Sequence, residues 1–273
     1  MNGVLGRPLL LVGCGKMGSA MLSGWRESGI AAAGVYVVEP MGASGVKLGA
    51  GTHAVTRAED LPAGLDPEVV VFAVKPQQMP EVAPQYRRFA KAGTLFLSIA
   101  AGTPIRFFEG RLGGDAAIVR AMPNTPAAIG QGITVACPNR RATAAQSALA
   151  RTLLQAVGEA VIVDDEALLD PVTALSGSGP AYVFLLIEAM ADAGVAAGLP
   201  RDLASRLALV TVAGAGQLAL NSADPPATLR ENVTSPGGTT FAALQVLMAK
   251  GGMGDLMERA IAAATRRSRE LAG

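Results

Sequence analysis

Charged residues are scarce in this sequence. They make up 16% of its 273 residues, against 50% apolar residues, and the formal net charge is only +1. A chain this close to neutral offers no basic surface for nucleic acid or for an acidic membrane, so we expect neither as a partner. So little charge also indicates that part of the surface is covered in another way, as it would be in a subunit interface.

Cysteine and histidine are scarcer still. Cys14 and Cys137 are far apart and match no CxxC or Cys/His spacing, so we expect neither a disulfide framework nor a metal site. A reducing, cytoplasmic environment fits this cysteine content. The single histidine, His53, has no carboxylate partner in sequence and is interpreted as a surface or structural residue. The N-terminal apolar run is too short for a signal peptide or a membrane span.

The length and the apolar pattern indicate two domains. Residues 1–163 alternate short apolar runs with helical stretches, which predicts an α/β Rossmann domain with a doubly wound, mostly parallel sheet. Residues 164–273 lack strand signals and predict an all-α domain. The expected strands are Leu9–Val12, Val35–Glu39, Val69–Val74, Leu95–Ser98, Ala117–Ala121, Thr134–Ala136 and Glu159–Val163. The expected helices of the second domain are Ala181–Ala197, Arg201–Asn221, Thr239–Lys250 and Asp255–Leu271.

A glycine motif follows the first expected strand. Gly13, Gly15 and Gly18 have the spacing GxGxxG at the mouth of a helix, so the backbone of this loop, with Cys14, Lys16 and Met17, is expected to bind a dinucleotide pyrophosphate. Glu39 ends the second expected strand, where an acidic residue accepts hydrogen bonds from the adenosine ribose. Cys14 is interpreted as a small side chain in a tight turn.

Three further segments leave the carboxyl ends of later strands, the edge at which open α/β sheets bind ligands. Taken singly, each could be an ordinary turn with Pro or Gly. Because they follow three strands of one predicted sheet, we expect them to line the nicotinamide half of a dinucleotide site. The candidate residues are Val74, Lys75, Pro76, Ala100, Ala101, Gly102, Pro123 and Asn124.

Two glycine-rich segments run into helices in the second domain. One is Ser176-Gly177-Ser178-Gly179, with Pro180 expected at the first helical position, and the other is Ser235–Gly238 ahead of Thr239 and Thr240. Each offers free N–H groups and a positive dipole end to a carboxylate. The alternative is that both are ordinary helix caps. The first segment also has the alternative of shaping the pocket and packing a dimer.

The helix expected over Ala181–Ala197 is apolar on nearly every side. Such a helix is buried all round, and a helical domain of this size hides one poorly by itself. We therefore expect it to pack against a second subunit.

These motifs together resemble the pyrroline-5-carboxylate reductase family. The matching stretches are GCGKMG, AVKPQ, SIAAG, AMPNTPA, SGSGPAY and TLRENVTSPGGTT, in this order over essentially the whole chain. The resemblance implies NAD(P)H-dependent reduction of 1-pyrroline-5-carboxylate to L-proline, the last step of proline biosynthesis. It also implies a homodimer built by the helical domain, which in that family often assembles into a decamer.

The resemblance further implies the substrate residues. It assigns the substrate carboxylate to Ser235, Gly238, Thr239 and Thr240, with the Thr240 hydroxyl also in reach of the ring nitrogen. Ser176 and Ser178 are further candidates. A protonated cyclic imine is already an electrophile, so hydroxyl groups and backbone amides suffice, with neither a metal nor a covalent nucleophile.

One position departs from the family pattern. Many members carry a small or basic pair where this chain has Glu39-Pro40, and the next cation is Lys47. A carboxylate there repels a 2′-phosphate, so the sequence favours NADH modestly although the family commonly uses NADPH.

Two other functions stay open at this point. A dehydrogenase of the β-hydroxyacid type needs a lysine in the helical domain, where Lys250 stands alone and far beyond the glycine segments. A dinucleotide-binding sensor without catalysis would have no need of the intact SGSGP and SPGGTT motifs.

Overall fold

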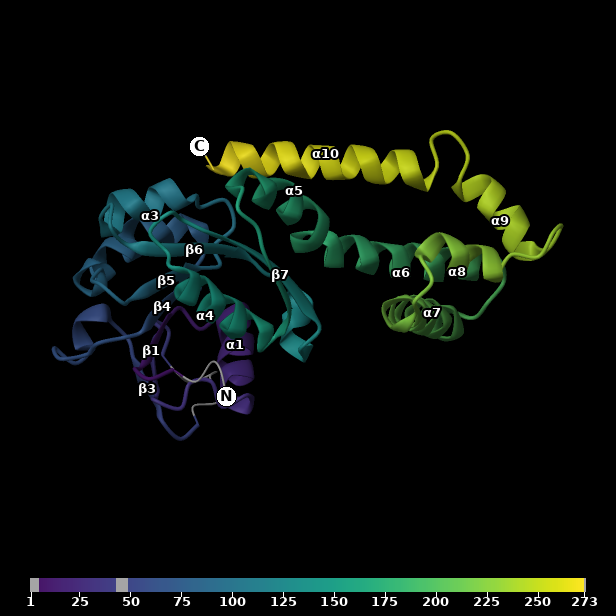
Figure 1. The fold of residues 1–273 in the computed structure, drawn as a ribbon. Coiled ribbons are helices and arrows are strands. Elements are labelled where there is room, and N and C mark those ends of the chain that lie inside the picture. Colours follow the sequence, from purple (N-terminus) through teal and green to yellow (C-terminus); the bar gives the residue numbers. More distant parts are fainter. Residues whose placement is uncertain (1–4, 43–48, 273) are drawn as a thin grey trace. The chain divides into compact units, whose positions relative to one another are not determined.

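The computed structural model describes residues 5–42 and 49–272 (Figure 1). The chain divides into two compact units, one formed by Met1–Gly177 with Ala264–Gly273 and the other by Ser178–Ala263. The sequence places a domain boundary earlier, at residue 163. Residues 164–177 belong to the first unit, because Leu169 is buried in the hydrophobic core of that unit.

Eight strands within the described residues form one sheet in the order β3-β2-β1-β4-β5-β6-β7-β8. Neighbouring strands are parallel except for β6 and β7, which are antiparallel. The strands are β1 Leu9–Val12, β2 Val35–Val38, β3 Thr52–Val55, β4 Val69–Phe72, β5 Leu95–Ser98, β6 Ala117–Met122, β7 Gly132–Pro138 and β8 Gly158–Ile162. The predicted doubly wound, mostly parallel sheet is confirmed.

Helices cover both faces of this sheet. Leu9 and Leu11 of β1 face a core shared with α1 (Lys16–Glu27) and α4 (Ala144–Gln155). Leu10 of β1 faces the opposite core, which is shared with the 3-10 helix η4 (Ala83–Phe89) and α3 (Ile105–Leu112). Because both faces are covered, the central strands β1, β4 and β5 are apolar at nearly every position. The short elements of this unit are η2 Ala58–Asp60, η3 Pro76–Gln78, α2 Met79–Val82, η5 Thr125–Ile129, η6 Glu166–Leu168, α5 Leu169–Val172 and the π-helical turn Thr173–Gly177.

The edge strands differ from the predicted pattern of burial on both faces. In β8, Glu159 is exposed and the side chain of Val161 remains 44% exposed, because β8 has a neighbour on one side only. On the other edge, β3 was not predicted, since THAV is short and half polar. It carries His53, which is exposed and stacks on Tyr36 of β2 at 5.0 Å between ring centroids. This surface position agrees with the interpretation of the histidine.

The second unit is entirely helical in its described part. Its helices are α6 Gly179–Ala196, α7 Arg201–Asn221, α8 Pro226–Asn232, α9 Thr239–Leu247 and the first half of α10, which runs from Met253 to Ala272. A Cβ added at Gly194 of α6 would lie 3.2 Å from the Cβ of Ala204 in α7, so this glycine allows the two helices to approach closely.

Much of the apolar surface of these helices is exposed in the single chain. On α6 the side chains of Val183, Phe184 and Leu185 are exposed, the last of them by 63%. Two stretches, Glu166–Ala196 and Arg201–Asn221, are long and apolar enough to cross a membrane by length and composition alone. Obligate subunit interfaces are as apolar as a domain core, so apolar helices of this kind also occur there.

Candidate cofactor site

The glycine motif forms the turn between β1 and α1. Gly13 has a φ of 87°, which favours glycine, and α1 begins at Lys16, directly after Gly15. A Cβ added at Gly18 would lie 2.5 Å from the carbonyl oxygen of Gly13, so only glycine lets the helix approach the turn this closely. At Gly15 an added Cβ would meet nothing within 4 Å. The open space above Gly15, at the N-terminus of α1, fits a pyrophosphate group.

Glu39 lies directly beside this turn, at the end of β2. Its Oε2 accepts a hydrogen bond from the backbone N–H of Cys14 at 2.8 Å, and its Oε1 accepts one from the N–H of Met41 at 3.1 Å. The carboxylate therefore already stabilises the glycine turn, and the N–H of Cys14 points to Glu39 in this conformation. Lys47, the cation named with Glu39 in the sequence, lies outside the described residues.

The Cys14 side chain is buried in the turn, with 6% of the residue exposed. Burial raises the pKa of its thiol, the Glu39 charge raises it further, and the contact with Ser19 lowers it. A thiol with a raised pKa stays protonated at neutral pH and is a poor nucleophile. The structure thus agrees with a small side chain tolerated in a tight turn.

A cavity of about 280 Å³ brings together most of the predicted nicotinamide-side residues. Its lining includes Met17, Val74, Lys75, Pro76, Ala100, Ala101, Pro123 and Asn124. These residues come from α1 and from the carboxyl ends of β4, β5 and β6, as the topology predicts. The Asn124 side chain has a second task, since its Oδ1 accepts a hydrogen bond from the N–H of Ile133 at 3.0 Å and so fixes the start of β7.

Gly102 was also predicted for the nicotinamide side, but it is not part of the lining of this cavity. A Cβ added at Gly102 would lie 3.3 Å from the Cβ of Leu271, so the end of α10 covers this glycine. The lining also includes Met122 and Gly177, which the sequence analysis did not assign to the cofactor. A Cβ at Gly177 would overlap the Cε atom of Met122, so the absence of a side chain at Gly177 lets the Met122 side chain pack against it in the lining.

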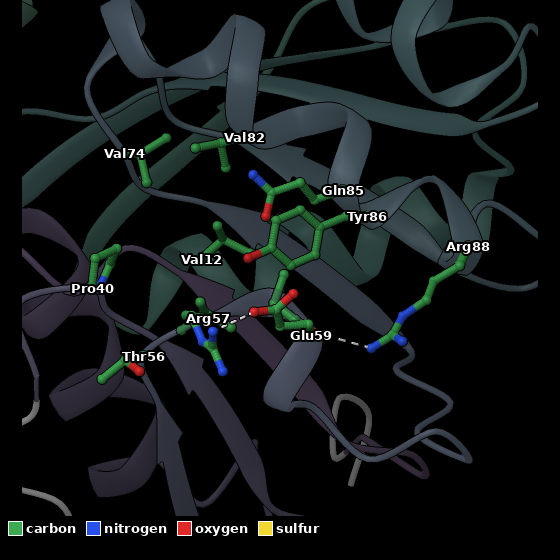
Figure 2. A pocket seen from close by; sticks show the side chains of 12 residues that line it. Val12, Pro40, Thr56, Arg57, Glu59, Val74, Val82, Gln85, Tyr86 and Arg88 are labelled. Carbon is green, nitrogen blue, oxygen red and sulfur yellow. Dashed lines mark hydrogen bonds and ion pairs between the residues drawn. The ribbon is translucent and has the colours of Figure 1, made fainter.

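A second cavity, of about 620 Å³, also has Val74 in its lining (Figure 2). Its lining residues are Val12, Val38, Pro40, Thr56, Arg57, Ala58, Glu59, Val74, Val82, Gln85, Tyr86 and Arg88. The two cavities adjoin, because Val74 lines both. The larger cavity also lies at the glycine turn, since Val12 in its lining directly precedes Gly13. Burial raises the pKa of the Tyr86 phenol, so its hydroxyl stays protonated at neutral pH. Of the lining residues from Thr56 to Arg88, the sequence predicts only Val74 as part of the site.

The sequence predicts a loop at the first glycine-rich segment, residues 176–179. The segment instead forms the end of a π-helical turn and the start of α6. Ser176 belongs to the π-helical turn, and its hydroxyl donates to the carbonyl of Val172 at 3.0 Å. Ser178 is the N-cap residue of α6, and Gly179 rather than Pro180 occupies its first position. Proline remains tolerated because the N–H groups of a first turn have no intrahelical partner.

The second glycine-rich segment is a turn that leads into α9. Gly237 has a φ of 69°, the N–H of Gly238 donates to the carbonyl of Ser235 at 3.0 Å, and α9 begins at Thr239. Ser235 and Thr239 are exposed and Thr240 is half-buried. Because Gly238 has no side chain to cap the helix, N–H groups of the first turn stay open to a ligand.

The described side chains, those of residues 5–42 and 49–272, contain no group of three or more His, Cys, Asp and Glu placed to hold a metal ion.

Two family models match the chain, one in each half. The model described as "NADP oxidoreductase coenzyme F420-dependent" matches residues 9–102, and the model described as "Pyrroline-5-carboxylate reductase dimerisation" matches residues 166–271.

Curated relatives match over almost the whole length. The pyrroline-5-carboxylate reductase of Pseudomonas aeruginosa is 45% identical, with 97% of this chain and 96% of the relative covered. The enzyme of the same name from Pisum sativum is 39% identical, with coverage of 95% and 94%.

Solved structures match over almost the whole chain as well. A pyrroline-5-carboxylate reductase from Coxiella burnetii superposes with a TM-score of 0.89 at 34% identity, covering 97% of this chain and 98% of its own. The Plasmodium falciparum pyrroline carboxylate reductase, solved with NADP bound, superposes with a TM-score of 0.82 at 30% identity, covering 99% and 100%.

Proposed function

The chain belongs to the pyrroline-5-carboxylate reductase family, and we propose how its two units divide the reaction of that family between them. It is an oxidoreductase that reduces 1-pyrroline-5-carboxylate to L-proline with a nicotinamide cofactor, in the last step of proline biosynthesis. The first unit holds the cofactor. The observation that carries this assignment is the pair of adjoining cavities that share Val74 beside the glycine turn.

The cofactor, when bound, supplies a hydride to the imine carbon, and the residues of the chain bind and orient the reactants. The turn at Gly15 and the N-terminus of α1 hold the pyrophosphate. The cavity at Val74, Ala100 and Pro123 holds the nicotinamide ring.

The turn before α9 in the second unit binds the substrate carboxylate. Support comes from the open N–H groups at the start of this helix and from the hydroxyls of Ser235, Thr239 and Thr240 on the same turn. Gly238 lets the carboxylate approach the backbone. Ser176 and Ser178 contribute less directly, because the Ser176 hydroxyl is already bonded to Val172.

Thr240→Ala tests the assignment of the substrate turn. Removal of a hydroxyl that orients the ring nitrogen should cost about 1–3 kcal/mol of transition-state stabilisation, which is roughly 5- to 150-fold in kcat/KM for the imine. The affinity for the cofactor should stay unchanged. Steady-state kinetics measure both.

A matched control is Thr234→Ala, since the Thr234 hydroxyl donates to the carbonyl of Arg230 within the chain. This variant should keep normal kcat/KM. An unaltered kcat/KM in Thr240→Ala would remove Thr240 from the substrate site.

The cofactor preference rests on Glu39. Its carboxylate lies at the glycine turn, where it accepts from a ribose diol and repels a 2′-phosphate, which favours NADH modestly. The NADP in the Plasmodium falciparum structure shows that a relative accepts the phosphorylated cofactor. We therefore expect both cofactors to be used, with NADH ahead.

Glu39→Ser should move this preference toward NADPH by about 1–3 kcal/mol, the scale of a hydrogen bond to a charged group. The measurement is the ratio of kcat/KM for NADH and NADPH, because the loss of the bond to Cys14 lowers both values together. Glu159→Ser makes the same change of charge on the exposed edge of the sheet and should leave the ratio unchanged. A wild type that strongly prefers NADPH, with the ratio unmoved by Glu39→Ser, would refute the role of Glu39.

The overall proposal is tested by NAD(P)H oxidation with pyrroline-5-carboxylate, measured beside plain cofactor binding. Turnover supports the reductase, whereas binding without turnover supports a sensor.

The helical unit makes the homodimer, in keeping with its family model. Association into a decamer and a cytoplasmic location extend the proposal, and light scattering and cell fractionation test them.

A further inference from the structure

The C-terminal end of α10 belongs to the first unit, although the helix begins in the second. The boundary falls inside α10, and from Ala264 onward the helix is part of the unit that holds the Rossmann sheet. Figure 1 shows this end of the helix beside α5. Among the residues of α10, all of which the structure describes, Ser268 is the one that is buried, with 5% of the residue exposed. A buried hydroxyl needs a hydrogen-bond partner, so this position marks a specific contact.

The partner of Ser268 is a carboxylate on α5. The Ser268 hydroxyl donates a hydrogen bond to Oδ1 of Asp170 at 2.7 Å. The Asp170 side chain is 16% exposed, and its Oδ2 lies 3.9 Å from Nε of Arg269. Because a carboxylate withdrawn from water loses free energy when its donor is removed, this contact is a firm one. It holds α5 against the end of α10.

The segment that carries Asp170 ends in the wall of the nicotinamide-side cavity. α5 continues directly into the π-helical turn, whose last residue, Gly177, lines that cavity. Hydroxyl groups tie the segment together, since Thr173 donates to the carbonyl of Leu169 at 2.7 Å and Ser176 donates within the same segment. A displacement at Asp170 is therefore carried along the segment to Gly177.

The same end of α10 contacts a second part of this wall. The loop after β5 lines the cavity at Ala100, and a Cβ built at Gly102 in that loop would lie 3.3 Å from the Cβ of Leu271. On α3, which follows the loop, Nη2 of Arg106 donates to the carbonyl of Ala272 at 3.0 Å. The last carbonyls of a helix have no intrahelical partner, so this arginine caps α10. One helix end thus joins two wall segments that are far apart in sequence.

We propose that Ser268 and Asp170 are positioning residues for the nicotinamide ring, because their hydrogen bond holds the Gly177 segment and the Gly102 loop in place around it. The inference rests on the proposed function, which places the ring in this cavity. Hydride transfer needs the reacting carbons within about 3–3.5 Å of each other, so a small movement of the wall lowers the rate more than the affinity. The pyrophosphate is held elsewhere, by the turn at Gly15.

Ser268→Ala in the full-length protein removes the donor and leaves the carboxylate in place. We expect kcat to fall about 5- to 50-fold, because the nicotinamide ring is held less precisely. The affinity for NADH should fall about 2- to 5-fold, since the loosened wall must be ordered on binding. ADP-ribose lacks the nicotinamide ring, so its dissociation constant should stay unchanged. Kinetics and calorimetry are run well below the thermal midpoint of each variant, where all of the protein is folded.

Two substitutions of Asp170 separate positioning from a general structural role. Asp170→Ala loses the acceptor and should behave like Ser268→Ala, and the double variant should fall no further than Asp170→Ala alone. Asp170→Asn keeps an acceptor oxygen of the same shape and should restore most of kcat. The matched control is Arg267→Ala, which removes an exposed ion pair with Glu270 on the same turn of α10. Its kcat should equal that of the wild type.

The proposal is overturned if Ser268→Ala keeps the wild-type kcat, or if its affinity for ADP-ribose falls by the same factor as kcat. The first result would show that the cavity wall does not depend on α10, and the second would indicate a general loosening of the unit. If the wild type bound ADP-ribose and reduced no imine, the proposed function would fail instead. The ratio of NADH to ADP-ribose affinity in Ser268→Ala would still test the positioning of the ring.

Discussion

Replacing Leu185 by Lys should convert the dimer into a monomer or an aggregate. Leu185 is 63% exposed in the single chain and stands on α6 among exposed Val183 and Phe184, so its substitution leaves the fold of one subunit intact. In a symmetric dimer the change occurs twice, and each ammonium buried in an interface costs several kcal/mol. The dissociation constant of the dimer should rise by a factor on the order of 10³ or more. Light scattering and analytical ultracentrifugation measure it.

Val161→Lys is the matched control for this experiment. Val161 is also an exposed branched apolar residue, but it lies on β8, outside the segment that matches the dimerisation model. This variant should remain a dimer with normal activity. If Leu185→Lys were an active dimer of unchanged stability, α6 would not form the interface.

Adding one methyl group at Gly15 or at Gly18 should abolish most of the cofactor affinity, for two different reasons. In Gly15→Ala the methyl group enters open space in the free protein, so the thermal midpoint should stay near that of the wild type. The methyl group of Gly15→Ala occupies the space where we place the cofactor pyrophosphate, so it blocks cofactor binding. In Gly18→Ala the Cβ lies 2.5 Å from the carbonyl oxygen of Gly13, and the turn must move. We expect a stability loss of about 1–3 kcal/mol for Gly18→Ala and a weakening of cofactor binding by roughly 100-fold in both variants.

Calorimetric titration with NADH and thermal denaturation separate the two effects. Gly110→Ala provides the control, since Gly110 lies within α3 and an added Cβ there also meets nothing within 4 Å. It should bind the cofactor normally. Normal affinity in Gly15→Ala would show that the pyrophosphate lies elsewhere.

The sequence predicts the central part of the fold well because the signals there are local and strong. β1 and β5 are buried on both faces, and their apolar runs begin and end where the predicted strands do. β3 escapes prediction because an edge strand needs only partial burial, and Thr52 and His53 do not interrupt it. The antiparallel pairing of β6 and β7 depends on contacts between strands, which an apolar run does not encode.

The same limit explains which site residues could be predicted. Residues at the carboxyl ends of predicted strands, such as Val74 and Ala100, line one cavity as expected. The part of the larger cavity around Arg57 is not predicted because the position of this residue depends on the pairing of β3 with β2. The hydrogen bond from the backbone N–H of Cys14 to the Glu39 carboxylate was missed because it joins two loops that are far apart in sequence, for which the sequence has no periodic signal. The roles of Thr240 and its neighbours in the substrate turn stay predictions.

The contact between Gly177 and Met122 has a consequence for the divergence of these enzymes. The two residues belong to separate motifs, AMPNTPA and SGSGPAY, yet a Cβ at position 177 would overlap the Cε methyl group of Met122. Substitutions at the two positions should therefore be tolerated as a pair more readily than singly. A relative with alanine or serine in place of Gly177 is expected to carry a residue shorter than methionine in place of Met122. The evolutionary history of one motif is in this way constrained by the other.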